Sequence, residues 1–248
     1  DGILRARAGG LTGILNGIDT REFDPAVDKA LPANFSVDDM AGKALCKAAL
    51  QKELGLGEDP GAPILAIVSR LTSQKGFDLV ERVLFEMMEK PVQLAVLGTG
   101  EAHYEGFFNW VQKRFPGRAA ARIEYNEGLA RRIYAGADLF LMPSLFEPCG
   151  LAQMIAMRYG TIPVVRETGG LRDSVKSYNR YEDTGTGFSF LNYNAHELLY
   201  TVQRAVDYFC DDPALWARLV ARAMRENFSW DERAKDYEEL YGQLIIDN

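Results

Sequence analysis

Two cations and several small polar residues follow an apolar run at residues 64–68. The segment at residues 69–76 reads Ser-Arg-Leu-Thr-Ser-Gln-Lys-Gly, with Arg70 and Lys75 as its cations. A guanidinium binds phosphate oxygens in pairs, and a lysine adds a mobile point charge. The segment is therefore a candidate anion clamp, with an ordinary solvated loop as the alternative interpretation. It is not a Walker A loop, because the G-x-x-x-x-G-K-[ST] pattern is absent.

A carboxylate, Glu147, lies between Pro143 and Pro148, just before a helix that we expect to begin near Gly150. A helix N-terminus directs backbone N–H groups and positive dipole charge toward a ligand. Glu147 would at the same time accept hydrogen bonds from hydroxyl groups. Cys149 is a thiol near that N-terminus, where a thiol pKa can be depressed. Because no histidine is paired with it, we do not predict a nucleophile.

A third turn of this kind, Thr168-Gly169-Gly170-Leu171, precedes another expected helix. Glycine permits close approach of the backbone, so the turn is a natural phosphate cradle, and a plain helix cap is the alternative. Three such turns at successive strand ends favour a small ligand that carries a diphosphate.

Other candidate motifs are weaker. Gly98-Thr99-Gly100 begins like a dinucleotide fingerprint, but His103 occupies the third glycine position, which disfavours a nicotinamide-dependent dehydrogenase. A tight turn at Gly98 still lets the backbone approach a ligand. Tyr125 offers an aromatic face for a base, with simple packing as the alternative. His103 and His196 are the only histidines, and we interpret both as surface or packing residues.

The elements that position these turns follow from hydrophobic periodicity. Apolar residues at helical spacing occupy residues 77–88, between two of the apolar runs. Nearly continuous apolar runs are typical of parallel strands that are covered on both faces. The alternation predicts a doubly wound, Rossmann-like α/β sheet, with ligands beyond the carboxyl ends of the strands. Strands are expected at residues 64–68, 93–97, 121–125, 139–142 and 162–165, and further helices at residues 38–53 and from Ala195, Pro213 and Trp230.

Composition narrows the function class. The 248 residues include 28 Lys+Arg and 35 Asp+Glu, for a net charge of −7, with 47% hydrophobic and 25% charged residues. These are values of a globular chain, and the acidic balance argues against a general nucleic-acid binder. No apolar run approaches the roughly 20 residues of a membrane span. Three scattered cysteines fit a reducing compartment, so we expect a cytoplasmic protein.

Six segments, in order along the chain, resemble the C-terminal domain of bacterial glycogen synthases and plant starch synthases, which are retaining glucosyltransferases of the GT-B fold. The Arg-Leu-Thr-Ser-Gln-Lys-Gly and Phe-Glu-Pro-Cys-Gly-Leu blocks are the most specific of them. The similar segments are residues 13–19, 69–76, 143–151, 159–163, 168–171 and 228–230.

The resemblance implies transfer of glucose from ADP-glucose to the non-reducing end of an α-1,4-glucan, with no metal or other cofactor. Arg70, Lys75 and Glu147 are the implied catalytic residues. Arg70 and Lys75 would hold the diphosphate and stabilise the leaving charge, and Tyr125 would pack on the adenine. Glu147 would hold the glucose hydroxyls together with backbone groups of Cys149 and Gly150. The implied donor site also includes Gly98, Leu151, and the N–H groups of Thr168, Gly169, Gly170 and Leu171.

The sequence departs from the family pattern at one position. Many related GT-B enzymes carry a second Glu eight residues after the first, where this chain has Ile155. This fits the synthase branch and leaves the ribose contact unassigned.

The resemblance also implies a domain organisation. Residues 1–13 would be a remnant of an interdomain connection, residues 14–228 the nucleotide-sugar domain, and residues 229–248 a C-terminal helix. That helix would return toward an N-terminal domain that this chain lacks, so we expect its apolar residues to be partly exposed. The chain alone would then bind ADP-glucose and transfer little glucose. The alternative is a non-catalytic module that binds a sugar nucleotide or a glucan.

Overall fold

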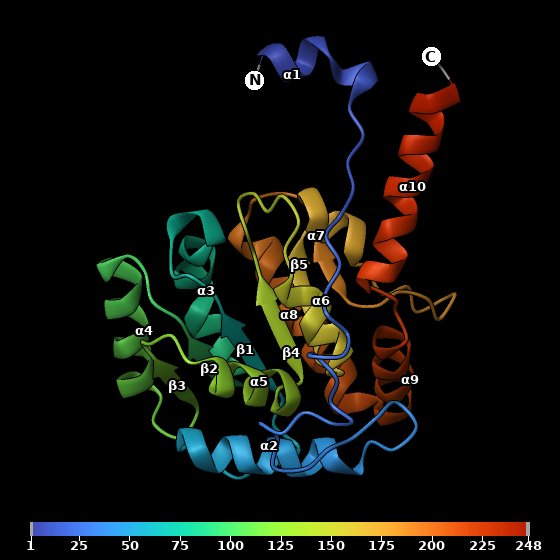
Figure 1. Cartoon of the computed structure of the whole chain (residues 1–248). Coiled ribbons are helices and arrows are strands. Elements are labelled where there is room, and N and C mark those ends of the chain that lie inside the picture. The colour runs from blue at the N-terminus through green and yellow to red at the C-terminus, as the bar shows by residue number, and fades with distance from the viewer. Residues whose placement is uncertain (1, 247–248) are drawn as a thin grey trace.

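The computed structural model describes residues 2–246 and contains one parallel sheet of six strands (Figure 1). Its strand order is β3-β2-β1-β4-β5-β6, and every neighbouring pair is parallel. The strands are β1 (Ile64–Val68), β2 (Gln93–Leu97), β3 (Ala119–Arg122), β4 (Leu139–Met142), β5 (Ile162–Arg166) and β6 (Phe188–Phe190). The doubly wound, Rossmann-like sheet predicted from the periodicity is confirmed.

The direction of winding reverses beside β1. From β1 the chain proceeds outward to β2 and β3, then returns so that β4 pairs with the other side of β1, with Leu65 opposite Leu139. In open α/β sheets, the crevice outside the carboxyl ends of two such strands is where ligands bind. The loops that follow β1 and β4 are therefore the part of the fold that matters for function.

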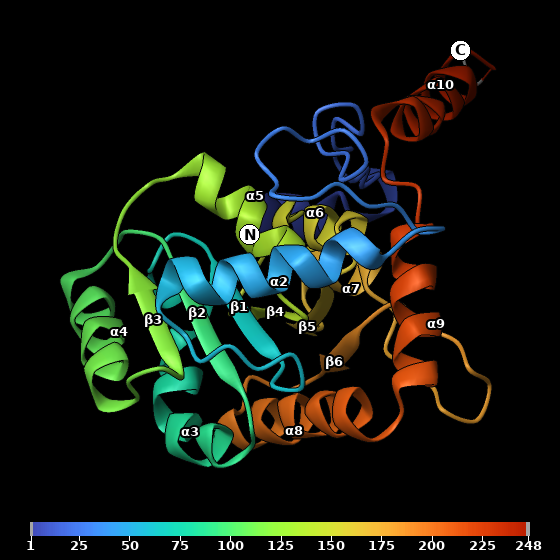
Figure 2. The same ribbon diagram turned by 90° about the horizontal axis from the view of Figure 1, so that it is seen from below.

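Helices cover both faces of the sheet (Figure 2). α3 (Phe77–Glu89) and α8 (Ala195–Asp211) pack together on one face, and α5 (Glu127–Gly136) and α6 (Ala152–Arg158) lie on the other. α2 (Ala41–Leu54) packs on α5, α4 (Ala102–Arg114) on β3, and α9 (Pro213–Met224) beside α6 and α8. Within residues 2–246, no helix is both long enough and apolar enough to cross a membrane.

Local sequence signals explain where several helices begin and end. Asp212 caps α9 by accepting the N–H of Leu215 at 2.9 Å, and Pro213 takes the first helical position. Asn194 caps α8 in the same way. α2 ends at Gly55, which has a left-handed φ of 72°.

Several elements differ from the sequence prediction. The strand expected at residues 121–125 is β3, two to three residues earlier, because Asn126 instead caps α5 through the N–H of Leu129. The helix expected near Gly150 is α6, which begins at Ala152, since Gly150 is left-handed with φ 72°. β6 was not predicted, because three residues are too short to show a clear period.

The two ends of the described chain leave the body together. The N–H of Ile18 donates to the carbonyl of Phe228 at 2.8 Å, next to a bridge between Ile18 and Ser229. Beyond this contact, α10 (Trp230–Ile246) and the segment with α1 (Gly2–Ala6) extend from the same end of the molecule (Figure 1). Tyr241 on α10 is 59% exposed. Asp1 and residues 247–248, which belong to the predicted terminal pieces, lie outside the described residues.

The loops after β1 and β4 touch each other at Gly76. This glycine has φ 76°, and a Cβ built on it would lie 2.1 Å from the carbonyl oxygen of Pro143. The N–H of Leu145 also donates to the carbonyl of Gln74 at 2.9 Å. The two loops are thus held at backbone contact distance.

Gly76→Ala is expected to lower the free energy of unfolding by about 2 kcal/mol, because the new methyl group overlaps Pro143 and the backbone is left-handed. Gly106→Ala is the matched control, since Gly106 lies in α4 with open space around its Cβ position. Alanine at that helical position should leave stability equal or higher by up to about 1 kcal/mol. Urea unfolding of both variants tests this, and equal stability of the two variants would contradict it.

Candidate functional site

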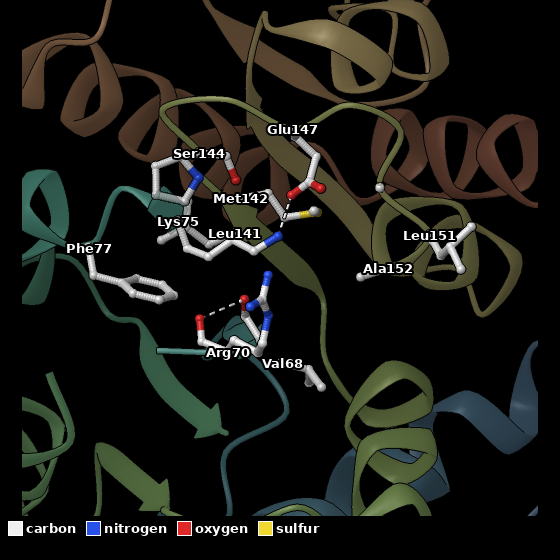
Figure 3. Close-up of a pocket in the computed structure, with 13 residues that line it drawn as sticks. Val68, Arg70, Lys75, Phe77, Leu141, Met142, Ser144, Glu147, Leu151 and Ala152 are labelled. Atoms are coloured by element: carbon white, nitrogen blue, oxygen red, sulfur yellow. Dashed lines mark hydrogen bonds and ion pairs between the residues drawn. The ribbon is translucent and has the colours of Figure 1, made fainter. Parts of the chain in front are cut away.

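A cavity of about 180 Å³ lies between the loops that follow β1 and β4 (Figure 3). It is lined by Arg70 and Lys75 from the first loop, and by Ser144 and Glu147 from the second. Its remaining wall comes from strand residues, from other residues of these loops, and from the first residues of α3 and α6. The structure therefore brings together the three residues that the resemblance implies to be catalytic.

Lys75 and Glu147 form an ion pair inside this cavity, between Nζ and Oε2. Their side chains are only 15% and 10% exposed. Arg70 is exposed, and its guanidinium has no hydrogen bond or ion pair with any described residue. In Figure 3 it points toward the same part of the cavity as the Lys75 ammonium. With two cations and one carboxylate, the cavity carries an excess of positive charge that suits an anion.

Hydrogen bonds to the loop after β2 hold the loop that carries Arg70 and Lys75 in place. The N–H of Ser73, at the start of the 3-10 turn η2 (Ser73–Lys75), donates to Oε1 of Glu101 at 2.9 Å. The N–H of Leu71 donates to the carbonyl of Thr99 at 2.9 Å. The loop after β2 thus positions the loop that carries Arg70 and Lys75.

Arg166 holds the loop that carries Glu147, and the sequence analysis assigned it no role. Its Nε donates to the carbonyl of Ser144 at 2.8 Å, and its Nη2 donates to the carbonyl of Leu145. Arg166 ends β5, so the only local signal was a cation at the carboxyl end of a strand. Through these two hydrogen bonds, its guanidinium helps to fix the loop that carries Glu147.

A second hollow, of about 470 Å³, continues from the first. Ser69 and Arg70 line both hollows, so Arg70 stands between them. Gly98, Tyr125 and Ile155 line the second hollow. Tyr125 is 89% exposed, so its ring is open to a ligand rather than buried in the core.

Arg131, on the wall of the second hollow, is held by carboxylates. It donates to Glu127 at 2.9 Å and to Glu22, and its Nη1 lies 3.6 Å from Oδ2 of the buried Asp28. Burial by itself would lower the pKa of Arg131, but these carboxylates raise it overall. The residue therefore stays charged and braces the hollow. Residues 20–35 are irregular, so no sequence pattern pointed to this network.

Of the other predicted site residues, some line one of the two hollows and Cys149 lines neither. Gly98 packs so tightly that a Cβ would lie 1.8 Å from the carbonyl oxygen of Ser69. Gly150 and Leu151 line the first cavity. Cys149 does not line it, and its Sγ accepts the N–H of Asn16 at 3.3 Å.

The turn from Thr168 to Leu171 differs from its expected role as a set of four N–H donors. The N–H of Thr168 donates to Arg166, that of Gly170 to the carbonyls of Glu147 and Pro148, and that of Leu171 to Thr168. Only the N–H of Gly169 has no partner among the described residues. A Cβ on Gly169 would lie 2.2 Å from the carbonyl oxygen of Glu147. The turn leads into α7 (Gly169–Ser174). It therefore holds the Glu147 loop through backbone contacts.

A larger hollow, of about 850 Å³, lies near the amino ends of β1 and β4, beside α2 and α9. Its buried charges already have partners. Lys47 pairs with Asp138 at 2.8 Å, and Nζ of Lys43 donates to the carbonyls of Ala135, Ala137 and Tyr159. Burial lowers the pKa of Lys43 to about 8. With these groups satisfied by the protein, this hollow is a weaker candidate site.

No group of three or more His, Cys, Asp or Glu side chains is arranged to hold a metal ion within residues 2–246. His103 pairs with Glu81 at 2.9 Å between α4 and α3, where both side chains are exposed. The interpretation of His103 as a surface residue is confirmed.

Comparison with known proteins places this geometry in a family. The family model described as glycosyl transferases group 1 matches residues 51–225. The chain belongs to the group 1 glycosyl transferases. The matched range includes both loops of the first cavity and the Thr168–Leu171 turn.

Relatives of this group 1 glycosyl transferase include two bacterial glycogen synthases. The chain is 53% identical to the glycogen synthase of Geobacillus thermodenitrificans and 50% identical to that of Clostridium perfringens, over 99% of the chain in both cases. It covers 50% and 51% of these relatives, so it spans about half the length of the curated relatives it matches. The part it matches is their C-terminal half.

A solved structure agrees. The catalytic domain of starch synthase IV from Arabidopsis thaliana, bound to ADP and acarbose, superposes with a TM-score of 0.90 at 38% identity. The match covers 98% of this chain and 50% of that one. The expected fold, a Rossmann-like half of a GT-B glycosyltransferase, is therefore confirmed.

Lys75→Met is expected to lower the free energy of unfolding by about 3 kcal/mol, because it leaves Glu147 as an unpaired charge with little solvent access. The double variant Lys75→Met/Glu147→Met should lose less than the sum of the two single variants, since an apolar pair leaves no buried charge. Chemical denaturation of the four proteins measures this coupling, and additive effects would contradict a buried ion pair.

Proposed function

We propose that this chain is the donor-binding half of a glycogen or starch synthase. The enzyme would transfer glucose from ADP-glucose to the non-reducing end of an α-1,4-glucan, with retention of configuration. The observation that carries the proposal is the pair of cations, Arg70 and Lys75, at the crevice where the winding of the sheet reverses. High identity to glycogen synthases over nearly the whole chain supports it.

Arg70 and Lys75 would bind the diphosphate of the donor. Arg70 is free to form paired hydrogen bonds with phosphate oxygens, and Lys75 reaches the same space from η2. As the bond to glucose breaks, negative charge grows on the leaving diphosphate. Two cations in the cavity stabilise that charge, so we propose that no metal or other cofactor is needed.

The second hollow would hold the adenosine. Tyr125 presents an exposed ring for stacking on the adenine, and Ile155 contributes an apolar wall. Gly98 lines this hollow, and its missing side chain lets the loop after β2 pack against Ser69. Arg70 lies between the two hollows, where the diphosphate of such a ligand would pass. The similar starch synthase was solved with ADP bound, which supports this placement.

Glucose would occupy the end of the first cavity nearest to α6. Glu147 would accept hydrogen bonds from its hydroxyls, with backbone groups of Gly150 and Leu151 close by. The N–H of Gly169 is the one member of the Thr168–Leu171 turn that would remain available to a phosphate oxygen.

A second domain would complete the cleft. The relatives are about twice as long as this chain, and α10 extends from the body beside the N-terminal segment (Figure 1). Exposed apolar side chains on these parts, such as Ile3, Tyr241 and Ile245, would be covered by that domain. Because closure of two domains excludes water from the reacting groups, the chain alone would transfer little glucose. We propose that it works in the cytoplasm.

This chain should bind ADP, and Arg70→Ala or Lys75→Ala should each weaken binding at least about ten-fold, because each removes charge-assisted hydrogen bonds to phosphate. Lys113→Ala, a cation on α4 outside both hollows, is the control and should bind as the unaltered chain does. Isothermal titration calorimetry measures all four affinities. Absence of binding of both ADP and ADP-glucose to the unaltered chain would contradict the proposed function.

Glucan synthesis distinguishes an incomplete enzyme from a non-catalytic module. Incubated with labelled ADP-glucose and glycogen, this chain alone is expected to incorporate little label, because half a cleft leaves the donor open to water. A longer protein that joins it to an N-terminal half like that of its relatives should incorporate label. Failure of that longer protein would favour a binding module, and rapid incorporation by this chain alone would contradict the need for a second domain.

A further inference from the structure

Two buried polar side chains line the first cavity. The first is the Glu147 carboxylate, which is in a residue only 9% exposed and whose only described side-chain partner is Lys75. The second is Oγ of Ser144, a residue 1% exposed, which has no hydrogen-bond partner among the described residues. Buried polar groups in native proteins are nearly always hydrogen-bonded, so an orphaned hydroxyl that lines a cavity is available to bond a molecule inside it.

Lys75 is the mobile member of its ion pair. It ends a short 3-10 turn and carries its charge on a flexible four-carbon stem. Glu147, by contrast, lies in a loop that is fixed by Arg166 through the carbonyl of Ser144 and by the N–H of Gly170 through its own carbonyl. Figure 3 shows the Arg70 guanidinium pointing toward the Lys75 ammonium. An anion that enters beside Arg70 would therefore draw Lys75 toward itself, while Glu147 stays in place.

Withdrawal of Lys75 leaves Glu147 charged, poorly solvated and unpaired, which is the costly state of a broken buried ion pair. Among the described residues, no other cation that lines the cavity compensates. Arg70 faces the same anion, and the guanidinium of Arg166 is occupied by the carbonyls of Ser144 and Leu145. A ligand that supplies only phosphate therefore binds Lys75 while breaking the ion pair between Lys75 and Glu147.

We propose that this cavity distinguishes a nucleotide sugar from the free nucleoside diphosphate through a change of partner at Glu147. The diphosphate draws Lys75 away, and the sugar hydroxyls then donate to Glu147 and hydrogen-bond to Ser144. A free nucleoside diphosphate leaves both groups without partners. The inference rests on the proposed function, in which this site binds ADP-glucose.

The same change of partner favours product release. Once glucose has been transferred, the diphosphate remains in the cavity beside an unpaired Glu147. Return of Lys75 to Glu147 restores the ion pair that the structure shows and removes one of the two cations from the product. Ser144 and Glu147 thus select for the donor and against its leaving group.

Glu147→Gln tests the inference by calorimetric titration of this chain with ADP and with ADP-glucose. The variant removes the charge that competes for Lys75, so ADP affinity should rise about ten-fold. ADP-glucose affinity should rise less or fall, so its preference over ADP shrinks by about the same factor. Glu81→Gln, the same change at an exposed carboxylate on α3, is the control and should leave both affinities unchanged.

Ser144→Ala provides a second readout and keeps the test decisive if circular dichroism shows that Glu147→Gln does not fold. It should weaken ADP-glucose about ten-fold and leave ADP unchanged, because only the sugar uses this hydroxyl. Ser36→Ala, outside both hollows, should change neither affinity. Equal weakening of both ligands by Ser144→Ala would overturn the inference.

The outcomes separate the inference from the proposed function. If the unaltered chain binds both ligands and Glu147→Gln leaves ADP affinity unchanged or lower, the change of partner is overturned and the donor site stands. If the unaltered chain binds neither ligand, the proposed function fails and the inference fails with it.

Discussion

Where β1 pairs with β4, the chain leaves the two strands toward opposite faces of the sheet, to α3 on one side and α6 on the other (Figure 2). The loops that follow these strands must therefore separate, and the space between them is the first cavity. Gly76 then brings the loops back into contact at Pro143, which limits how far they diverge. Every charged group that lines the first cavity depends on this geometry, because Arg70, Lys75 and Glu147 each lie on one of the two loops.

The charge of the site depends on which of the nearby Arg and Lys side chains already have partners in the protein. The chain is acidic overall, yet Arg131 is held by three carboxylates and Arg166 by backbone carbonyls, so both serve the structure. Lys75 is shared with Glu147, and Arg70 has no described partner. Within the candidate site, Arg70 thus leaves positive charge without a described partner between the two hollows. An anionic ligand is drawn to that place against the net charge of the chain.

The two terminal segments of the described chain meet away from the candidate site. Ile18 and Phe228 join the incoming and outgoing segments by a backbone hydrogen bond, so both leave the body at one point. Close approach of Gly17 to Trp230, where a Cβ would lie 2.7 Å from the backbone nitrogen, tightens this junction.

The amino-acid sequence by itself determined the α/β class, the positions of most strands and helices, and the segments that carry Arg70, Lys75 and Glu147. Hydrophobic period and turn chemistry are local properties, so they can be read along the chain. Only the tertiary structure decided that Lys75 pairs with Glu147, 72 residues away, and that the Thr168–Leu171 turn supports a loop. It also left Ser144 without a partner and braced Arg131 with Asp28. Partners of polar groups depend on which loops the sheet order brings together, and no local pattern encodes that proximity.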